Sequence, residues 1–346
     1  MKILLVNKYL YRKGGAETYF IKLGEYLKSL GNEVEYFGMA DERNCVGNRV
    51  EAYTENIDFH KKSLKHITYP FKIIYSVNAR KQIRKVLSNF KPDVVHLNNF
   101  NYQLTPSIIY EIKKHNIPIV YTAHDVQLVC PNHKLKNDYT DGLCRKCDGG
   151  KYFECVKNNC VHSSKIRSIL GAVEAWYYKL RHTYKMIDLT VCPSEFMEKE
   201  ISRNDDINGR TVTMYNFIDE IKPLGAECEN YVLYFGRYSE EKGISNLVKA
   251  AKKLSNIPFV FAGKGELENE VNSADNIKNV GFKTGDELRN IIEKALFTVL
   301  PAEWSENCPF SVMDNILEEN SLPKIILVDF HAEATGEKGG FAYAYD

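Results

Sequence analysis

The sequence predicts an α/β protein made of two doubly wound halves, each with a parallel sheet between layers of helices. Two stretches carry this prediction, because each reads as a strand, a glycine-bearing turn and a helix. The first is 1–31, in which the strand MKILLVN is followed by Gly14-Gly15 and an apolar helix. The second is 231–266, in which YVLYF is followed by Gly236, a polar turn and another such helix. Sheets of this type bind ligands at the carboxyl ends of their strands, so the two halves are expected to face one cleft.

The rest of the chain continues the alternation of strands and helices. Further strands are expected in the first half at 33–38, 92–97, 118–123 and 187–192, and in the second half at 259–262, 280–282, 297–301, 324–329 and 340–345. Further helices are expected at 104–114, 168–186, 195–202 and 286–295.

Length and composition fit this architecture. The 346 residues favour about two domains, and 44% hydrophobic with 26% charged residues is ordinary for a globular chain. A formal net charge of +1 argues against a protein that binds polyanions over its whole surface. No segment approaches the ~18 apolar residues of a membrane span, and the short N-terminal apolar run reads as a strand, not a signal peptide. We therefore expect a cytoplasmic protein whose nine cysteines are mostly reduced or metal-bound.

The stretch 231–266 also carries candidate binding chemistry. A strand that ends in a glycine-bearing loop and opens a helix presents backbone N–H groups to an anion, and here Arg237 and Lys242 add two cations. The next strand, 259–262, closes with Gly263-Lys264-Gly265. Together these features predict a diphosphate site. On this stretch alone, a surface loop with two solvated charges is an equally good interpretation.

In the first half, the strand 118–123 runs directly into His124 and Asp125. Polar side chains just past the carboxyl end of a parallel strand lie where such sheets bind ligands. A histidine at this position can act as a general acid or base, donate a hydrogen bond to substrate, or be a satisfied structural residue. Its location favours a functional role.

The segment 128–163 reads as a cysteine-rich insertion. It contains Cys130, Cys144, Cys147, Cys155 and Cys160. Cys144 and Cys147 have the spacing of a metal-binding thiolate pair, and Cys155 with Cys160 could complete a structural zinc site. Reduced thiols, or disulfides in an oxidising compartment, are the alternatives. A catalytic zinc is not expected, because the segment offers no other reaction centre.

From Lys61 to Lys91 the chain is basic, with interleaved apolar residues that predict a helix face. One interpretation is a basic amphipathic surface that rests on anionic lipid. A solvated outer helix face is equally compatible with the pattern. Nucleic acid fits less well, because no stacking-aromatic motif accompanies the charge.

Four motifs stand in order along the chain. They are Gly14-Gly15-Ala16-Glu17, His124-Asp125, Phe235-Gly236-Arg237 followed by Glu241-Lys242-Gly243, and the carboxylates Glu306 and Asp314. In this order the sequence resembles the family-four glycosyltransferases, which are retaining nucleotide-sugar enzymes with the GT-B fold. The resemblance covers nearly the whole chain. It implies two Rossmann-like domains, 1–218 on the acceptor side with the insertion, and 219–346 for the nucleotide-sugar donor.

The resemblance also implies roles for individual residues. Arg237 and Lys242 would neutralise the leaving diphosphate without a metal, which their chemistry permits. Glu306 would hold the donor sugar's hydroxyls beside an oxocarbenium-like transition state, and Asp314 would hold the ribose. His124 would lie over the donor sugar at the acceptor face. The donor-binding set is completed by glycines that let backbone approach the phosphates, namely Gly14, Gly15, Gly236, Gly263 and Gly265.

Three features depart from the family pattern. The second acidic residue is Asp314 where the family has Glu, and Phe330-His331 follow a strand where the family has two glycines. The chain also stops at Asp346, where the family continues with several helices. These departures predict a C-terminally truncated relative whose second domain lacks its terminal helices.

The sequence therefore predicts a retaining, metal-independent hexosyltransferase that needs no cofactor. Its donor would be a nucleoside-diphosphate sugar and its acceptor a polysaccharide or a lipid-linked saccharide. It would lie in the cytoplasm, with peripheral contact at the inner face of the membrane, and would not bind nucleic acid. A degenerate relative that binds nucleotide weakly without catalysis is the alternative. A GT-B epimerase or phosphorylase would need a different carboxylate set or a cofactor lysine that this sequence does not show.

Overall fold

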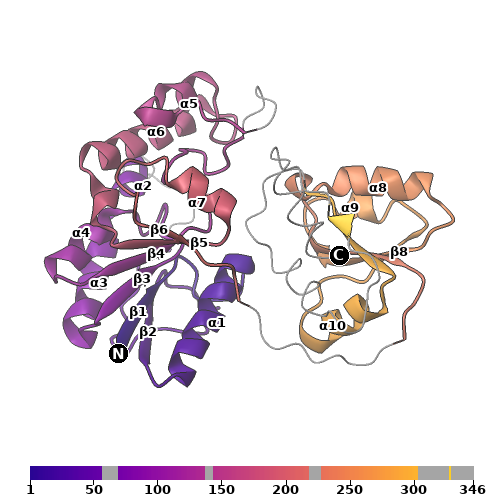
Figure 1. Ribbon diagram of the computed structural model, residues 1–346, viewed down its shortest axis with the longest axis horizontal. Coiled ribbons are helices and arrows are strands. Elements are labelled where there is room, and N and C mark those ends of the chain that lie inside the picture. Colours follow the sequence, from indigo (N-terminus) through magenta and orange to yellow (C-terminus); the bar gives the residue numbers. More distant parts are fainter. Residues whose placement is uncertain (57–68, 137–142, 218–226, 303–326, 329–346) are drawn as a thin grey trace. The chain divides into compact units, whose positions relative to one another are not determined.

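The computed structural model describes residues 1–56, 69–136, 143–217, 227–302 and 327–328 (Figure 1). The chain divides into two compact units, Met1–Asn216 and Phe217–Asp346. The predicted domain boundary, between residues 218 and 219, lies in the segment 218–226, which is outside the described residues. In the described part of the chain, no helix is both long enough and apolar enough to cross a membrane.

The first unit contains a six-stranded sheet in which every strand is parallel to its neighbours. The strand order is β2-β1-β3-β4-β5-β6. The strands are β1 (Lys2–Val6), β2 (Glu33–Phe37), β3 (Val94–Leu97), β4 (Ile119–Thr122), β5 (Leu189–Cys192) and β6 (Thr211–Thr213). The sequence predicted the first five and missed β6, a three-residue edge strand too short to show an alternating pattern.

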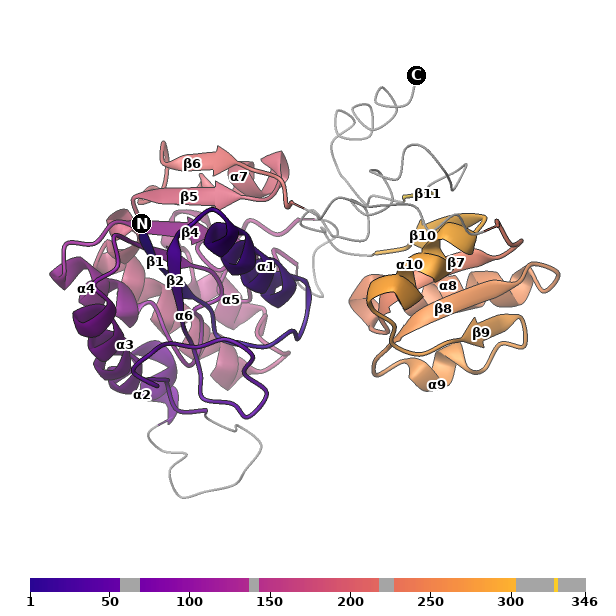
Figure 2. The same ribbon diagram turned by 90° about the horizontal axis from the view of Figure 1, so that it is seen from below.

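Helices cover both faces of this sheet (Figure 2). The alternating side chains of β1 show why, because Ile3 and Leu5 pack with α1 (Gly15–Ser29) whereas Leu4 and Val6 lie in the larger core on the other face. The larger core includes α3 (Val77–Phe90), α4 (Ser107–Lys114) and α7 (Glu195–Ile201). The remaining helical elements are α2 (Tyr69–Ile74), η2 (Asp148–Gly150), α5 (Phe153–Lys157), α6 (Lys165–Leu180) and η3 (Thr183–Met186). A doubly wound first half is confirmed.

The basic segment differs from the continuous helix face that its sequence predicts. It contains two helices, α2 and α3, because the side chain of Ser76 caps α3 by accepting the N–H of Ala79 at 3.1 Å. The part of the segment before residue 69 lies outside the described residues. The helix predicted over 168–186 also ends early, at Leu180, and η3 follows it.

The second unit contains a five-stranded parallel sheet in the order β11-β10-β7-β8-β9. Its strands are β7 (Val232–Arg237), β8 (Phe259–Lys264), β9 (Ile277–Asn279), β10 (Phe297–Leu300) and β11 (Leu327–Val328). The other elements are η4 (Glu240–Lys242), α8 (Ile244–Lys253), α9 (Glu268–Val271) and α10 (Gly285–Lys294). Strand β7 is central and faces two cores, since Val232 and Tyr234 pack with α8 and Leu233 and Phe235 with α10.

One strand of this sheet was placed wrongly from the sequence. The prediction put a strand at Val280-Gly281-Phe282, but β9 lies at Ile277–Asn279. Gly281 has φ +72°, a turn conformation, and the Phe282 side chain is exposed. Of the strand predicted at 324–329, residues 327–328 are described as β11, whereas the strand predicted at 340–345 lies outside the described residues.

Candidate functional site

His124 lies immediately after β4 and is held on two sides. Its Nε2 is 2.9 Å from Oδ1 of Asn98, which follows β3, and its ring meets the ring of Tyr19 edge to face at 5.2 Å. Tyr19 comes from the first turns of α1, so three elements position the imidazole. With Oδ1 of Asn98 accepting from Nε2, the Nδ1 atom of His124 is left as a hydrogen-bond acceptor.

The environment keeps His124 neutral at physiological pH. Burial lowers its pKa from 6.5 to about 4, and the opposing effect of the Asp125 charge is weaker. Its neighbour His96 on β3 also has its pKa lowered to about 4, by burial and then by His124. A neutral imidazole can orient a hydroxyl group by hydrogen bonding, but it carries no charge to balance an anion.

Asp125, the second residue of the predicted pair, lies beside a histidine of the same loop. Its Oδ2 lies 3.5 Å from Nδ1 of His133, and its Oδ1 accepts the N–H of Gln127 at 2.9 Å. Burial alone would raise the pKa of Asp125, but His133 lowers it below the usual value of an aspartate. Burial alone would lower the pKa of His133, but the carboxylate of Asp125 raises it above the usual value of a histidine. Each residue thus favours the charged form of the other, within the loop that follows β4.

A carboxyl group on α6 with a raised pKa accompanies this pair. Burial raises the pKa of Glu174, on α6, to about 7, and His133 opposes that shift. Neither His133 nor Glu174 was among the residues predicted to form the site. His133 was visible as a histidine among the cysteines, but nothing in the sequence placed Glu174 near it, because α6 begins about thirty residues later.

Gly14 and Gly15 form the N-terminus of α1. Gly14 is the N-cap, with extended backbone dihedrals, and its carbonyl accepts both the N–H and the hydroxyl of Thr18, at 3.0 and 2.9 Å. Gly15 begins the helix and is exposed. The first N–H groups of a helix have no partner inside it, so this turn can offer backbone donors to an anion. Contact with donor phosphates stays a prediction.

In the second unit, one connection carries both predicted cations. Arg237 ends β7 and Lys242 ends η4, directly before the N-cap of α8 at Gly243. The Arg237 side chain is 65% exposed and forms a long ion pair, 3.9 Å, with Glu241. The structure thus places two cations and a helix N-terminus at the carboxyl end of the central strand.

A third cation lies at the same edge and was missed. In the parallel register of β7 and β8, Gly236 is opposite Gly263 and Arg237 is opposite Lys264. Lys264 is exposed, and its ammonium lies 5.1 Å from the centre of the Phe282 ring. Lys264 could have been found from the sequence, because it lies between Gly263 and Gly265, which were both predicted to belong to the site.

The glycines of this edge have a packing role of their own. A Cβ on Gly263 would lie 1.9 Å from the carbonyl oxygen of Gly236, and one on Gly265 would lie 2.2 Å from that of Tyr238. Gly243 has φ +69°, and its Cβ would lie 1.8 Å from the carbonyl oxygen of Pro301. Backbone therefore approaches backbone here, so glycine is required whether or not a ligand binds. The predicted carboxylates Glu306 and Asp314, and Phe330-His331, lie outside the described residues.

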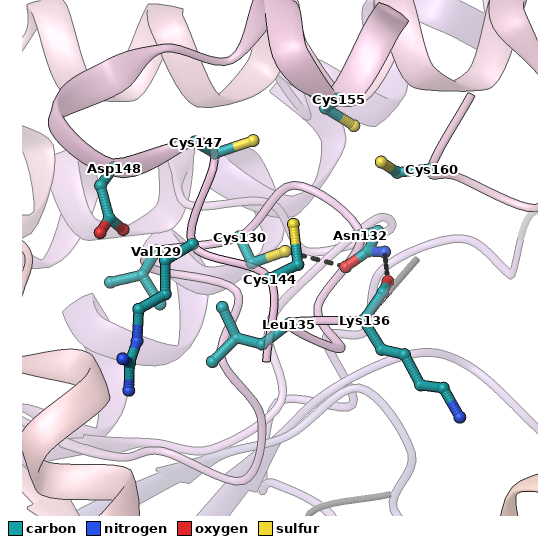
Figure 3. Close-up of a pocket in the computed structure, with 11 residues that line it drawn as sticks. Val129, Cys130, Asn132, Leu135, Lys136, Cys144, Cys147, Asp148, Cys155 and Cys160 are labelled. Carbon is teal, nitrogen blue, oxygen red and sulfur yellow. Dashed lines mark hydrogen bonds between the residues drawn. The ribbon is translucent and has the colours of Figure 1, made fainter. Parts of the chain in front are cut away.

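The cysteine-rich segment forms a small cavity in the first unit (Figure 3). The four predicted ligands, Cys144, Cys147, Cys155 and Cys160, all line it. Cys130 lines it as a fifth thiol, and none of the eight described cysteines forms a disulfide. With the side chains as they stand, no three Cys, His, Asp or Glu groups of the described residues are placed to hold an ion. The zinc assignment stays a prediction.

Three family models match the chain. The model of glycosyltransferase family 4 matches residues 13–221, the model of glycosyl transferases group 1 matches 217–316, and that of YmdB-like protein matches 291–346. The matched ranges of the first two follow one another with a short overlap, close to the point where the structure divides into two units.

Curated relatives and solved structures agree with these matches. An uncharacterized 42.6 kDa protein in the cps region of Klebsiella pneumoniae is 25% identical, covering 95% of this chain and 85% of that protein. An uncharacterized glycosyltransferase of Methanocaldococcus jannaschii is 20% identical, covering 87% and 72%. The crystal structure of Anabaena HepE in complex with UDP and glucose has a TM-score of 0.55 at 15% identity, covering 89% and 76%. Because the family 4 model matches more than half of its residues, this chain belongs to glycosyltransferase family 4, and its two parallel α/β units are those of the GT-B fold.

Proposed function

We propose that this glycosyltransferase moves a sugar from a nucleoside-diphosphate donor to a polysaccharide or lipid-linked acceptor, with retention of anomeric configuration. The observation that carries the proposal is the cationic edge of the second unit, which we define as Arg237, Lys242 and Lys264. This edge suits a diphosphate, because it combines three cations, of which Arg237 and Lys264 are exposed, with the N-terminus of α8. HepE, which has the same fold, was crystallised with UDP and glucose.

The cationic edge would act mainly on the leaving group. As the bond between the anomeric carbon and the diphosphate oxygen breaks, negative charge grows on the diphosphate, and fixed cations stabilise that charge. The guanidinium of Arg237 can bind two phosphate oxygens at once, whereas the ammonium groups of Lys242 and Lys264 act as point charges. With this charge supplied by side chains, we propose that turnover needs no divalent ion.

The remaining roles follow from the family resemblance. A neutral His124 would orient a sugar hydroxyl through a hydrogen bond at the acceptor side, a role that suits its lowered pKa of about 4. Glu306 would hold the hydroxyls of the donor sugar and Asp314 the ribose, and Gly14 and Gly15 would approach the phosphates. The acceptor oxygen would attack on the face that the diphosphate leaves, with a phosphate oxygen accepting its proton.

A donor screen tests this proposal. The full chain is incubated with UDP-, GDP-, ADP- and TDP-sugars and oligosaccharide acceptors, with and without a chelator of divalent ions. We expect one donor to be consumed in both conditions, and proton NMR at early times should show product with the anomeric configuration of the donor. Weak nucleotide binding without turnover of any donor would favour the alternative of a degenerate family member. Turnover with inversion would contradict the proposed stereochemistry.

We also propose that the protein lies in the cytoplasm and contacts the inner face of the membrane through α3. The structure reduces the charge available for this contact, because Arg80 and Arg84 donate to the carboxylate of Glu111 on α4, at 2.8 and 2.6 Å. Hydrogen bonds from Arg84 and then Arg80, despite burial, lower the pKa of Glu111 to about 2, so this ion pair persists. Lys81 and Lys85 remain exposed on the same helix.

Vesicle flotation measures the membrane contact. The Lys81→Glu/Lys85→Glu double variant should bind vesicles with anionic lipid at least about thirtyfold more weakly than the wild type, since each surface cation contributes about 1 kcal/mol to such binding. A double variant with the same charge change elsewhere in the first unit, Lys165→Glu/Lys199→Glu, serves as the control. Equal loss in both variants would show that only net charge matters and that α3 is not the contact.

A further inference from the structure

Lys8 follows the end of β1, and its side chain reaches the loop that follows the neighbouring strand β3. Its ammonium group donates a hydrogen bond to Oδ1 of Asn101 at 3.2 Å. It also lies over two aromatic rings, 5.0 Å from the centre of the Tyr9 ring and 5.2 Å from that of Tyr102. Because β1, β3 and β4 are neighbours in the sheet (Figure 1), Lys8 lies at the same carboxyl edge as His124.

The protein satisfies only part of what this ammonium group can bind. A protonated lysine has three N–H donors, and in the described part of the chain only Asn101 accepts from the Lys8 side chain. The carboxylates of Glu17 and Asp125 act on the charge of Lys8 from a distance, but within the described ranges neither forms an ion pair with it. Two donors and the positive charge are therefore left for a ligand.

The carboxylate of Asp125 is engaged elsewhere. Its Oδ2 lies 3.5 Å from Nδ1 of His133, and Nδ2 of Asn101 lies 3.5 Å from the same oxygen. Asn101 therefore stands between Lys8 and Asp125, with its oxygen toward the ammonium group and its nitrogen toward the carboxylate. The ring of Tyr102 stacks on that of His133, with 5.7 Å between the ring centres. These contacts hold Lys8 apart from the carboxylate of Asp125.

Burial makes the unpaired charge of Lys8 costly. The residue is partly buried, and burial, the largest effect on its pKa, lowers that pKa from 10.5. A charge removed from water is normally paired, and two aromatic faces replace only part of the lost hydration. An anion beside the ammonium group would supply the missing partner. Lys13 adds a second cation, exposed, with its ammonium group 3.8 Å from the centre of the Tyr9 ring.

We propose that Lys8 determines acceptor specificity by binding an anionic group of the acceptor, with Lys13 beside it at the rim. The acceptor would then be an acidic saccharide that carries a sugar carboxylate or a phosphate. This inference rests on the proposed function, because it takes the first unit to be the acceptor side. The donor diphosphate is assigned to the cationic edge of the second unit, so the charge of Lys8 is left for the acceptor.

Two matched pairs of probes test the proposal by ligand-observed NMR titration of the full chain at low salt, with saturating UDP present. The first pair is a tetrasaccharide containing glucuronic acid and the same tetrasaccharide with its carboxyl groups reduced to alcohols. The second pair is glucose 1-phosphate and glucose. We expect the wild type to bind at least one acidic probe about tenfold or more tightly than its neutral partner, an effect typical of a hydrogen bond to a charged group. The pair that shows the difference distinguishes a carboxylate from a phosphate.

Variants assign the preference to Lys8. Lys8→Met keeps an unbranched stem between the two tyrosine rings but removes the charge, so it should abolish the preference for the acidic probe. Lys8→Arg keeps the charge and should retain most of the preference. The matched control is Lys28→Met, because Lys28 also lies over a tyrosine ring, 4.9 Å from the centre of Tyr36, but in the last turn of α1. It should bind all four probes like the wild type.

A labelling experiment on the wild type does not depend on the folding of variants. Lysines are acetylated briefly with and without each probe, and mass spectrometry measures the modification of every lysine. The acidic probe should slow the labelling of Lys8, its neutral partner should not, and the labelling of Lys28 should not change with either.

Four results would each overturn the proposal. They are equal affinity for the acidic and neutral probes, no binding of either acidic probe, a preference that survives in Lys8→Met, and a loss in Lys8→Met of UDP binding instead of probe binding. The last result would place Lys8 in the donor site. None of these readouts uses sugar transfer, so the acceptor preference can fail while the proposed function stands.

Discussion

Arg237→Ala and Lys242→Ala are each expected to lower turnover at least about a hundredfold, with little change in melting temperature. Each change removes a cation from the edge where the leaving diphosphate develops its charge, and one such contact typically contributes about 3 kcal/mol in the transition state. Arg237 is largely exposed and Lys242 ends a surface turn, so neither change disturbs the core. Turnover is measured as donor consumption at saturating donor.

Two further variants make this prediction specific. Lys264→Ala tests the third cation of the edge, and we expect a loss of about tenfold or more, because Lys264 lies opposite Arg237 in the sheet. Lys249→Ala removes an exposed cation from α8, away from that edge, and should leave turnover unchanged. The site assignment is wrong if both Arg237→Ala and Lys242→Ala turn over donor like the wild type.

The first unit is expected to lose stability steeply on acidification, between pH about 6.5 and about 4. Burial lowers the pKa values of His96 and His124 from 6.5 to about 4. Above pH about 6.5 both histidines are neutral in the folded and the unfolded chain, so they do not make the free energy of unfolding depend on pH. Below it, the unfolded chain takes up protons that the folded protein excludes. Each of the two lowered pKa values should reduce the free energy of unfolding by on the order of 3 kcal/mol once the pH lies below the pKa in the folded protein.

Thermal unfolding of the full chain as a function of pH measures this effect. We expect His96→Gln to show a smaller fall in the first unit's melting temperature from pH about 7 to about 4.5, because glutamine does not titrate. Gln can also keep a hydrogen bond to Thr122, which accepts or donates at 2.8 Å in the wild type. The exposed His115 gives the control, His115→Gln, which should follow the wild type. If the melting temperature falls equally on acidification in the wild type, His96→Gln and His115→Gln, protonation of His96 does not destabilise the fold and the prediction is wrong.

Much of the fold could be predicted because its strands are short apolar runs that end at glycine or at polar residues. The strand β1, with its four buried residues, and β7 both gave unambiguous patterns. The failures were local. The pattern of Val280 and Phe282 favoured a strand, but the register of β9 with β8 placed it three residues earlier. The cap at Ser76 broke a helix that apolar spacing had predicted as continuous.

The candidate site was predicted where one loop carries the chemistry and missed where distant segments meet. Arg237 and Lys242 share a connection, so their order in the sequence was sufficient. Lys264 required the register of two strands, and Cys130 required the packing of the loop after β4 against α5. Contacts of this kind depend on the tertiary fold, which sequence spacing does not contain.

The strand order of the first sheet has a consequence for synthesis on the ribosome. From β1 onward, β3, β4, β5 and β6 are added on one side in the order in which they are translated. Each strand leaving the exit tunnel therefore finds the outer edge of the nascent sheet free, and no later strand has to insert between two that have already paired. The first unit can fold vectorially before the second has been translated, as N-terminal domains commonly do. The second sheet grows differently, because β10 and β11 lie on the side of β7 opposite to β8 and β9. One edge of the central strand β7 therefore stays unpaired until β10 has been translated.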